Sequence, residues 1–245
     1  MTVPASQALA SASQMPGLVT LDALGTLVEL EDPYRRLADE LAARGAPVEV
    51  AAARAALRAE MAHYREHHDI ASDLDGLARL RADCTEVLRA ALPAPAAALG
   101  NDALLDALLA ALRFRPFPEV GDVLRDLRAS GAVLVVVSNW DVSLHEVMER
   151  TGLRALVDAV LTSAEIGEAK PGGAMFRAAL ELAGARPAEA VHAGDSIEHD
   201  VAGARAMGMV AVLVDRDGSA GAVPAGVPVV SDLRGVRAAA PYPSA

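Results

Sequence analysis

The alternation of apolar strands and helical segments between residues 119 and 215 is the feature that most restricts the fold of this chain. Apolar runs lie at residues 132–139, 156–163, 189–195 and 209–215, of which the first is rich in β-branched residues, and helical periodicity separates them. A further apolar run, GLVTLD, occupies residues 17–22. Strands without a polar face are typical of parallel sheets that are covered by helices on both faces. The sequence therefore predicts an α/β fold built on a doubly wound parallel sheet.

The segment from residue 32 to residue 115 interrupts this pattern, because it is helical throughout and contains no strand-like run. Glycine and proline divide it into roughly four helical stretches. We therefore predict a Rossmann-like core at residues 17–31 and 116–235, with an all-helical cap domain inserted at residues 32–115. Residues 1–16 are expected to be a disordered N-terminal tail, and residues 236–245 a C-terminal tail.

The composition argues against several classes of function. The formal net charge of −11 and the pI of about 5.0 give no basic surface for nucleic acid or for an anionic membrane. The single cysteine, Cys84, cannot form an internal disulfide and fits a reducing compartment. The first 16 residues lack the features of a signal peptide, and no apolar run reaches the roughly 18 residues of a membrane span. We expect a cytoplasmic monomer or homodimer.

Polar residues follow the apolar strands at the points where the strands end. They are Asp22, Ser138, Asn139, Lys170 and Asp195. Each of them alone would be an ordinary turn or helix-cap residue. In open parallel sheets, however, ligands bind at the carboxyl ends of the strands. The sequence therefore predicts one polar site at this edge of the sheet.

Four motifs contain these residues: DALGT at 22–26, SNWD at 138–141, EAKPG at 168–172 and GDSIEHD at 194–200. Together they resemble the motifs of the haloacid dehalogenase-like hydrolase superfamily, and the resemblance extends from Gly17 to about Asp215. The helical segment lies where members with a helical cap of the C1 type, subfamily IA, carry that cap. The resemblance therefore implies a hydrolase with a capped Rossmann-like core.

The resemblance also implies roles for individual residues. Asp22 would be the nucleophile, which takes the transferred group as an acyl-enzyme ester that water attacks later. Thr26, Ser138 and Asn139 would hold the transferred group. Lys170 would neutralise its charge, and Asp195 would ligate Mg²⁺. Trp140, the only tryptophan, could line the substrate pocket or brace the cap.

The chemistry of the residues agrees with a divalent cation. Asp22 and Asp195 at adjacent strand ends would repel and raise each other's pKa unless a cation lies between them. Mg²⁺ prefers oxygen ligands and keeps several waters, so it suits one or two carboxylates and a substrate phosphate. Leu24 can add its backbone carbonyl. Asp200, one helical turn beyond Asp195, can hold Lys170 or a metal-bound water, and we count it among the expected metal-site residues.

Lys170 is the only lysine among 22 basic residues, so the chain uses arginine wherever else it needs a positive charge. A lysine ammonium is a compact charge with three rotatable donors, whereas the arginine guanidinium is a planar fork. The exception indicates a tight pocket between carboxylates and a phosphoryl group. We therefore predict that Lys170 is catalytic.

Leu24 is where the chain departs from most phosphatases of the superfamily, which carry a second aspartate two residues after the nucleophile. That aspartate protonates the leaving group and then activates water, and such help is worth about 10²–10⁴-fold. We favour a Mg²⁺-dependent phosphatase of a small phosphorylated metabolite, in which the acid comes from the cap or the leaving group needs none. Candidates for a cap acid are Tyr34, His63, Glu66 and His67.

Two alternatives stay open. A 2-haloacid dehalogenase is metal-independent and also lacks the second acid, and Arg35 and Arg36 could hold the haloacid carboxylate. Against it, dehalogenases carry Ser and Asn where this chain has Gly194 and Asp195. The other alternative is a weakly active or degenerate member that binds a phosphorylated ligand. The intact nucleophile, lysine and metal-site aspartate argue against that alternative.

Three further patterns receive ordinary structural interpretations. The sequence HYREH at residues 63–67 matches the His-x-x-Glu-His of zinc peptidases, but we interpret it as the polar face of a cap helix. His192 and His199 are interpreted as a packed strand residue and a helix-surface residue. Ser143 and Glu146 have the spacing of a capping box at the start of a helix.

Overall fold

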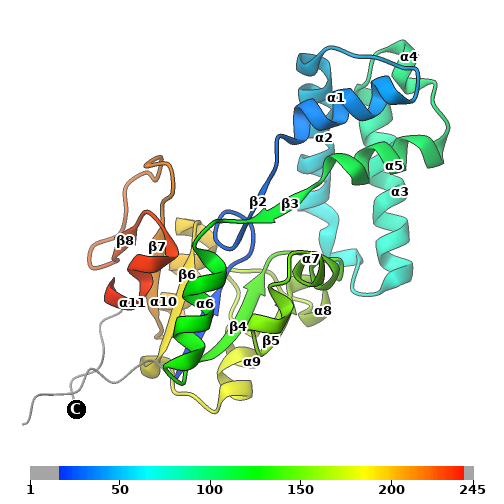
Figure 1. Cartoon of the computed structure of the whole chain (residues 1–245). Helices are drawn as coiled ribbons and strands as arrows, with labels where there is room; N and C mark the ends of the chain where they lie inside the picture. Colours follow the sequence, from blue (N-terminus) through cyan, green and yellow to red (C-terminus); the bar gives the residue numbers. More distant parts are fainter. Residues whose placement is uncertain (1–16, 240–245) are drawn as a thin grey trace, which may run out of the picture.

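A six-stranded parallel sheet lies at the centre of the computed structural model, which describes residues 17–239 (Figure 1). Its strand order is β5-β4-β1-β6-β7-β8. The strands are β1 (Leu18–Leu21), β4 (Val133–Ser138), β5 (Ala159–Thr162), β6 (Ala190–Gly194), β7 (Val210–Val214) and β8 (Val229–Val230). β1 pairs with β4 on one side and with β6 on the other, so the three strands end side by side. The predicted α/β fold with a parallel sheet is confirmed.

Helices cover both faces of the sheet. On one face, α6 (Val120–Ala129), α7 (Leu144–Arg150) and α11 (Val236–Ala239) pack on strand residues that include Val19 and Val136. On the other face, α9 (Ala174–Ala183) and α10 (Ala202–Ala206) pack on the alternate strand residues, among them Leu18 and Val135. Both faces of the sheet bury mostly apolar side chains, with Thr20 and His192 as buried polar residues inside β1 and β6.

Along the chain, helices α1 to α5 come after the first strand of the sheet and before its other strands. They have a hydrophobic core of their own. They are α1 (Pro33–Ala43), α2 (Val50–His67), α3 (Leu74–Ala91), α4 (Ala94–Ala97) and α5 (Asn101–Ala111). Their buried side chains include Leu37, Leu57, Leu80, Leu88 and Leu104. Figure 1 shows these helices, here called the helical insert, standing apart from the sheet. None of the helices in residues 17–239 is long and apolar enough to cross a membrane.

Two short strands connect the helical insert to the sheet. β2 (Val28–Leu30) and β3 (Phe114–Pro116) pair in antiparallel register, with Glu29 opposite Arg115. This ribbon carries the chain into the insert and back (Figure 1). The sequence analysis did not predict it, and β3 begins inside the segment expected to be wholly helical. Three-residue strands are too short for their side-chain alternation to be recognised in a sequence.

Not every local prediction from the sequence agrees with the structure. The predicted capping box at Ser143 is wrong, because Ser143 already has helical backbone angles and its side chain caps nothing; its N–H instead donates to Asp141 Oδ1 at 2.6 Å. The helix expected at 198–208 is a π-helical turn, Ile197–Val201, followed by α10. Within the expected C-terminal tail, Val236 begins α11 and is buried. The expected disordered tail 1–16 and residues 240–245 lie outside the described residues.

Candidate active site

Asp22 directly follows the central strand β1, and its side chain is buried. Its backbone N–H donates to the carbonyl of Ala193 in β6 at 3.0 Å, which extends the pairing of β1 with β6. The chain then turns back, and the N–H of Val28 donates to the carbonyl of Ala23 at 2.9 Å. Gly25, whose φ is 82°, supplies the left-handed backbone angle of this turn. The turn leaves the Asp22 carboxylate at the edge of the sheet.

Two donors hold the same oxygen of Asp22. Ser138 Oγ, at the end of β4, donates to Asp22 Oδ1 at 3.0 Å, and Lys170 Nζ donates to it at 2.7 Å. No donor within residues 17–239 lies at hydrogen-bond distance from Asp22 Oδ2. The carboxylate, which lines a cavity, therefore has one oxygen fixed and the other free. This is the arrangement that an oriented nucleophile requires.

Lys170 is fixed by contacts to both its backbone and its side chain. The Asn139 amide donates from Nδ2 to the Lys170 carbonyl at 2.9 Å and accepts at Oδ1 from the Lys170 N–H at 2.7 Å. Nζ donates to Asp200 Oδ1 at 2.5 Å, and His192 Nε2 lies 3.0 Å from the same oxygen. His192 Nδ1 in turn lies 2.9 Å from Thr20 Oγ1. The lysine is thus held by a buried hydrogen-bonded network that begins in β1 and β6.

The charges of this network are distributed unequally. Burial raises the pKa of Asp22, although Lys170 opposes this effect, and Asp200 raises it further. Burial would lower the pKa of Lys170, but the two carboxylates raise it above its usual value. Burial would also raise the pKa of Asp200, yet Lys170 and His192 hold it well below its usual range. Lys170 and Asp200 therefore form a stable ion pair, and the charge on Asp22 is the less stabilised one.

Asp195 brings a third carboxylate to this edge. One oxygen each of Asp22, Asp195 and Asp200 lie within 4.8 Å of one another. Desolvation by the surrounding protein, followed by the charges of Asp22 and Asp200, raises the pKa of Asp195 to about 7, although its side chain reaches solvent. Asp200 already accepts hydrogen bonds from Lys170, His192 and the Ser196 N–H. Asp22 and Asp195 thus have carboxylate oxygens available to bind a metal ion, and a divalent cation would offset the repulsion between the two carboxylates.

Two glycines make room for these carboxylates. A Cβ on Gly25 would lie 2.1 Å from Asp195 Oδ2, and a Cβ on Gly194 would lie 2.2 Å from Asp200 Cγ. Any side chain at either position would displace the acid beside it. Close approach therefore explains the glycine of the GDSIEHD motif, and close approach together with a positive φ explains that of the DALGT motif.

The other residues predicted for the site differ in how they lie. Leu24 lines the cavity and is 41% exposed, so no acidic side chain occupies this position beside Asp22. Trp140 also lines the cavity, where its Nε1 donates to Ser143 Oγ at 3.3 Å and its ring centroid lies 5.0 Å from that of Phe114. Thr26 is fully buried, does not line the cavity, and its Oγ1 has no hydrogen-bond partner within the described chain.

The cavity, with a volume of about 660 Å³, extends from Asp22 into the helical insert. None of the proposed cap acids lines it: Tyr34, His63, Glu66 and His67 all lie elsewhere. The ionisable insert residues that do line it are Glu60, Tyr64, Arg65, His68, Asp69 and Arg81. The sequence analysis missed these residues. Glu60 and Tyr64 continue the spacing of the buried Ala53, Ala56 and Leu57 along α2, and this periodicity could have revealed them.

The helical insert is also joined to the sheet domain away from the ribbon. His68 Nε2 lies 2.9 Å from Ser163 Oγ, at the start of α8 (Ser163–Ile166). The Val142 N–H donates to the Ala71 carbonyl at 3.0 Å, and the Asp141 N–H donates to the Tyr64 hydroxyl at 3.4 Å. These contacts fix the end of α2 beside the loop that follows β4. They therefore set the position of one cavity wall relative to Asp22.

Arg216, just beyond β7, supports the turn that follows Asp22. Its Nε donates to the Gly25 carbonyl at 3.0 Å, and its Nη2 donates to the Thr26 carbonyl at 2.6 Å and to Glu119 at 2.7 Å. The guanidinium carbon lies 3.5 Å from the centre of the Phe117 ring. Sequence reasoning missed this residue, although its place after a strand was a signal. Its planar fork donates to two carbonyls and a carboxylate while its face lies on the Phe117 ring.

Comparisons with known proteins agree with this geometry. Bovine (Bos taurus) haloacid dehalogenase-like hydrolase domain-containing protein 3 is 47% identical over 91 residues, which are 37% of this chain and 36% of that protein. A ribulose-1,5-bisphosphate 5-phosphatase of Halopiger xanaduensis is 38% identical over 124 residues, which are 50% of this chain and 51% of that protein. The matches thus span only about a third to a half of these relatives.

Solved structures share the fold over most of the chain. A HAD phosphatase from Thermococcus onnurineus has a TM-score of 0.63 at 23% identity, and the match covers 90% of this chain and 96% of that one. An L-2-haloacid dehalogenase from Xanthobacter autotrophicus also has a TM-score of 0.63, at 20% identity, with 91% and 98% covered. The family model for haloacid dehalogenase-like hydrolases matches residues 17–208, which hold every carboxylate of the site. The chain belongs to the haloacid dehalogenase-like hydrolase family.

Proposed function

We propose that this hydrolase is a Mg²⁺-dependent phosphatase of a small phosphorylated metabolite, of the subfamily IA type with a C1 cap formed by residues 32–115. The observation that carries the proposal is Asp195, a carboxylate whose oxygen lies within 4.8 Å of one on Asp22. A second acid so close to a nucleophile hinders displacement unless a cation is bound there. The phosphatases among the relatives, such as the ribulose-1,5-bisphosphate 5-phosphatase, support the same choice.

In the first step, Asp22 Oδ2 attacks phosphorus. An Oδ2–P bond forms, the bond from phosphorus to the ester oxygen breaks, and the leaving group takes the bonding electrons. Ser138 and Lys170 keep Oδ1 in place, so that the free oxygen stays directed toward the substrate. Lys170 also offsets negative charge as the phosphoryl group approaches. Water then attacks the phosphorus of the aspartyl phosphate, which releases phosphate and regenerates Asp22.

Asp22, Asp195 and the Leu24 carbonyl would hold the Mg²⁺, and Asp200 would support the site through Lys170. The bound ion supplies charge neutralisation between the carboxylates and the phosphoryl oxygens. Ser138 and Asn139, which line the cavity, would lie beside the transferred group, whereas Thr26 is fully buried and does not line the cavity. Because both polar atoms of the Asn139 side chain bind the backbone of Lys170, the role of Asn139 is to position that lysine.

The leaving group receives no proton from residue 24. Leu24 is apolar, and the carboxyl of Asp141, the nearest acid in the SNWD motif, is buried and accepts the Ser143 N–H. A substrate whose leaving oxygen is weakly basic, such as an aryl or acyl phosphate, needs no such acid. We therefore expect this enzyme to favour substrates of that kind.

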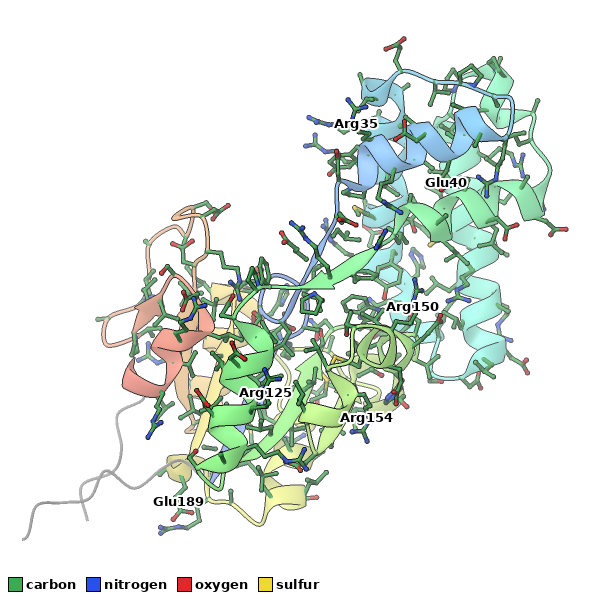
Figure 2. All side chains as sticks on the ribbon, in the orientation of Figure 1. Arg35, Glu40, Arg125, Arg150, Arg154 and Glu189 are labelled. Carbon is green, nitrogen blue, oxygen red and sulfur yellow. The ribbon has the colours of Figure 1, made fainter. Side chains whose placement is uncertain are left out.

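The alternative of a 2-haloacid dehalogenase finds support in Leu24 and in the fold shared with the Xanthobacter protein. The two arginines that were expected to hold the haloacid carboxylate are not at the site. Arg35 pairs with Asp32 on the outer side of the insert, and Arg36 pairs with Glu31 (Figure 2). Neither arginine lines the cavity at Asp22.

One experiment separates these functions. The purified protein is incubated with a panel of phosphorylated metabolites and 4-nitrophenyl phosphate, with and without Mg²⁺, and with 2-chloropropionate. We expect phosphate release that requires Mg²⁺ and no chloride release. Metal-independent chloride release without any phosphate release would reject the proposal. A weakly active, ligand-binding protein would instead bind phosphorylated compounds and release neither product.

A further inference from the structure

Glu60 is a buried acid that the mechanism does not use. It lies in α2, its residue is 3% exposed, and it lines the cavity that leads to Asp22. Among the described residues, the one group that lowers the pKa of its carboxyl is the neighbouring Cys84 thiol of α3. No arginine, lysine or histidine among the described residues forms an ion pair with it. Burial of a carboxyl group without an ion pair lowers the stability of the folded protein.

The surroundings of Glu60 are mostly apolar. The insert side chains that line the cavity with it include Met61, Leu77, Leu80, Leu108, Leu109 and Leu112. Phe114 and Trp140 line the part nearer to the sheet. A cavity of about 660 Å³ is within the roughly 300–1,000 Å³ that hold drug-sized ligands, so it exceeds what a phosphoryl group needs. The space therefore suits an extended apolar group attached to the phosphate.

Burial shifts the pKa of Glu60 upward, as it does for carboxyl groups in general. Desolvation raises its pKa to about 7, and only the Cys84 contact opposes the shift. Burial also raises the pKa of the Cys84 thiol, so the thiol stays protonated and can donate. A hydroxyl of a ligand would bring no charge to offset that of an ionised Glu60. An ammonium group would ionise it, and the two charges would attract strongly in a low-dielectric cavity.

We propose that the cavity binds the organic part of the substrate and that Glu60 recognises a basic amine at its far end. The substrate class is then a phosphorylated compound with a largely apolar framework and a distal amine. This inference rests on the proposed function, because it takes the phosphate to be bound at Asp22. Arg81 lines the same cavity from α3 and has no ion-pair partner among the described residues, which makes an anionic end group the main competing outcome.

The test uses aryl phosphates, because a phenolate leaves without an acid at position 24. The probes are phenyl phosphates with a para chain of one to four methylenes that ends in an amine, a hydroxyl, a methyl or a carboxylate. We measure kcat/KM with Mg²⁺ for the wild type, for Glu60→Gln, and for Glu66→Gln as the control. Glu66 lies on the same helix, is exposed and does not line the cavity.

We expect at least one amine probe to exceed its hydroxyl and methyl analogues by about tenfold or more in kcat/KM. In Glu60→Gln this ratio falls to near one, whereas in Glu66→Gln it stays at the wild-type value. Because the readout is a ratio between probes, a general loss of activity in Glu60→Gln does not affect it. Glu60→Asp, which keeps the charge, should retain part of the preference.

Three results would overturn the inference: no preference for the amine, a preference that survives Glu60→Gln, or a preference for the carboxylate. Failure of the proposed function looks different, since no probe would release phosphate at all. In that case calorimetric titration of the wild type compares the amine and methyl probes by affinity. Equal affinities would then reject the role of Glu60 separately.

Discussion

Lys170 Nζ lies 2.7 Å from Asp22 Oδ1, at the centre of a buried network. The same nitrogen lies 2.5 Å from Asp200 Oδ1, and both acids are buried with it. An ammonium fits between two carboxylates because its three donors can point in different directions. The position of the single lysine of the chain is therefore set by geometry as well as by charge.

Replacing Lys170 by arginine should abolish most activity even though the charge is kept. The planar guanidinium is larger and has to displace either Asp22 or Asp200, so we expect a loss of kcat of about 10²-fold or more. Steady-state kinetics with 4-nitrophenyl phosphate measure the loss. Arg35→Lys, the reverse exchange at an exposed site, serves as the control and should leave kcat unchanged. Full activity of Lys170→Arg would show that the pocket does not select for lysine.

Removal of the metal should stop phosphate release. Asp195 has no ion-pair partner among residues 17–239, so we expect a cation from solution to offset its repulsion with Asp22. Chelation with EDTA should therefore reduce activity to background, and added Mg²⁺ should restore it. Asp195→Asn removes one ligand charge and should raise the Mg²⁺ concentration that gives half-maximal activity by about tenfold or more. Unchanged activity in EDTA would contradict the proposed metal site.

The glycine at position 25 permits a matched comparison. Gly25 and Gly45 have similar backbone angles, with φ of 82° and 79°, so an alanine at either costs about 1 kcal/mol of backbone strain. Only at Gly25 would the new Cβ meet Asp195 Oδ2; at Gly45 nothing lies within 4 Å. We expect Gly25→Ala to lose activity and Mg²⁺ affinity and Gly45→Ala to lose neither. Thermal unfolding, monitored beside the kinetics, checks that the two variants are comparably stable.

The location of the site could be predicted from the sequence because it follows from the fold class. Strands that are apolar on both faces predict a parallel sheet, and a parallel sheet brings its carboxyl ends together. Asp22, Ser138 and Lys170 lie in contact for this reason, although they are far apart in the chain. Asp22 and Lys170 could therefore be placed at one site without knowledge of side-chain packing.

The cavity walls could not be predicted in the same way. The cap acids Tyr34, His63 and His67 were chosen for their chemistry, without a criterion for which side of a helix faces the sheet. His63 and His67 instead stack on each other, with ring centroids 4.1 Å apart. The buried contacts of Arg216 likewise depend on how the turn after β1 meets the end of β7. Such contacts are set by tertiary packing, which leaves no periodic signal in a sequence.

Loss of the Arg216 side chain should affect both stability and catalysis. Arg216→Ala leaves Glu119, which is 3% exposed, without its counter-ion, and removing one partner of a buried pair costs about 3 kcal/mol. It also frees the Gly25 and Thr26 carbonyls, so the turn beside Asp22 loosens and kcat should fall with little change in KM. Arg125→Ala, at an exposed pair with Asp122, is the control. Equal stability of the two variants would contradict this role.

The pH dependence of folding provides a test of Glu60 that does not require a substrate. Burial raises its pKa from 4.5 to about 7, so the folded protein retains a proton that the unfolded chain releases above about pH 4.5. Glu60 therefore lowers the free energy of unfolding progressively as the pH rises from about 4.5 to 7, and this loss of stability stays constant above pH 7. It amounts to about 3 kcal/mol at pH 8.

Glu60→Gln removes this titration, because an amide is neutral at every pH. The free energy of unfolding of the variant, minus that of the wild type, should therefore grow by about 3 kcal/mol between pH 4.5 and pH 8. Urea unfolding at several pH values measures the difference, and any constant effect of the amide cancels between them. Glu66→Gln should give a difference that does not change with pH, since Glu66 is exposed. A flat profile for Glu60→Gln would mean that water or a cation reaches Glu60 in the folded protein, and that its carboxylate is not held for a ligand.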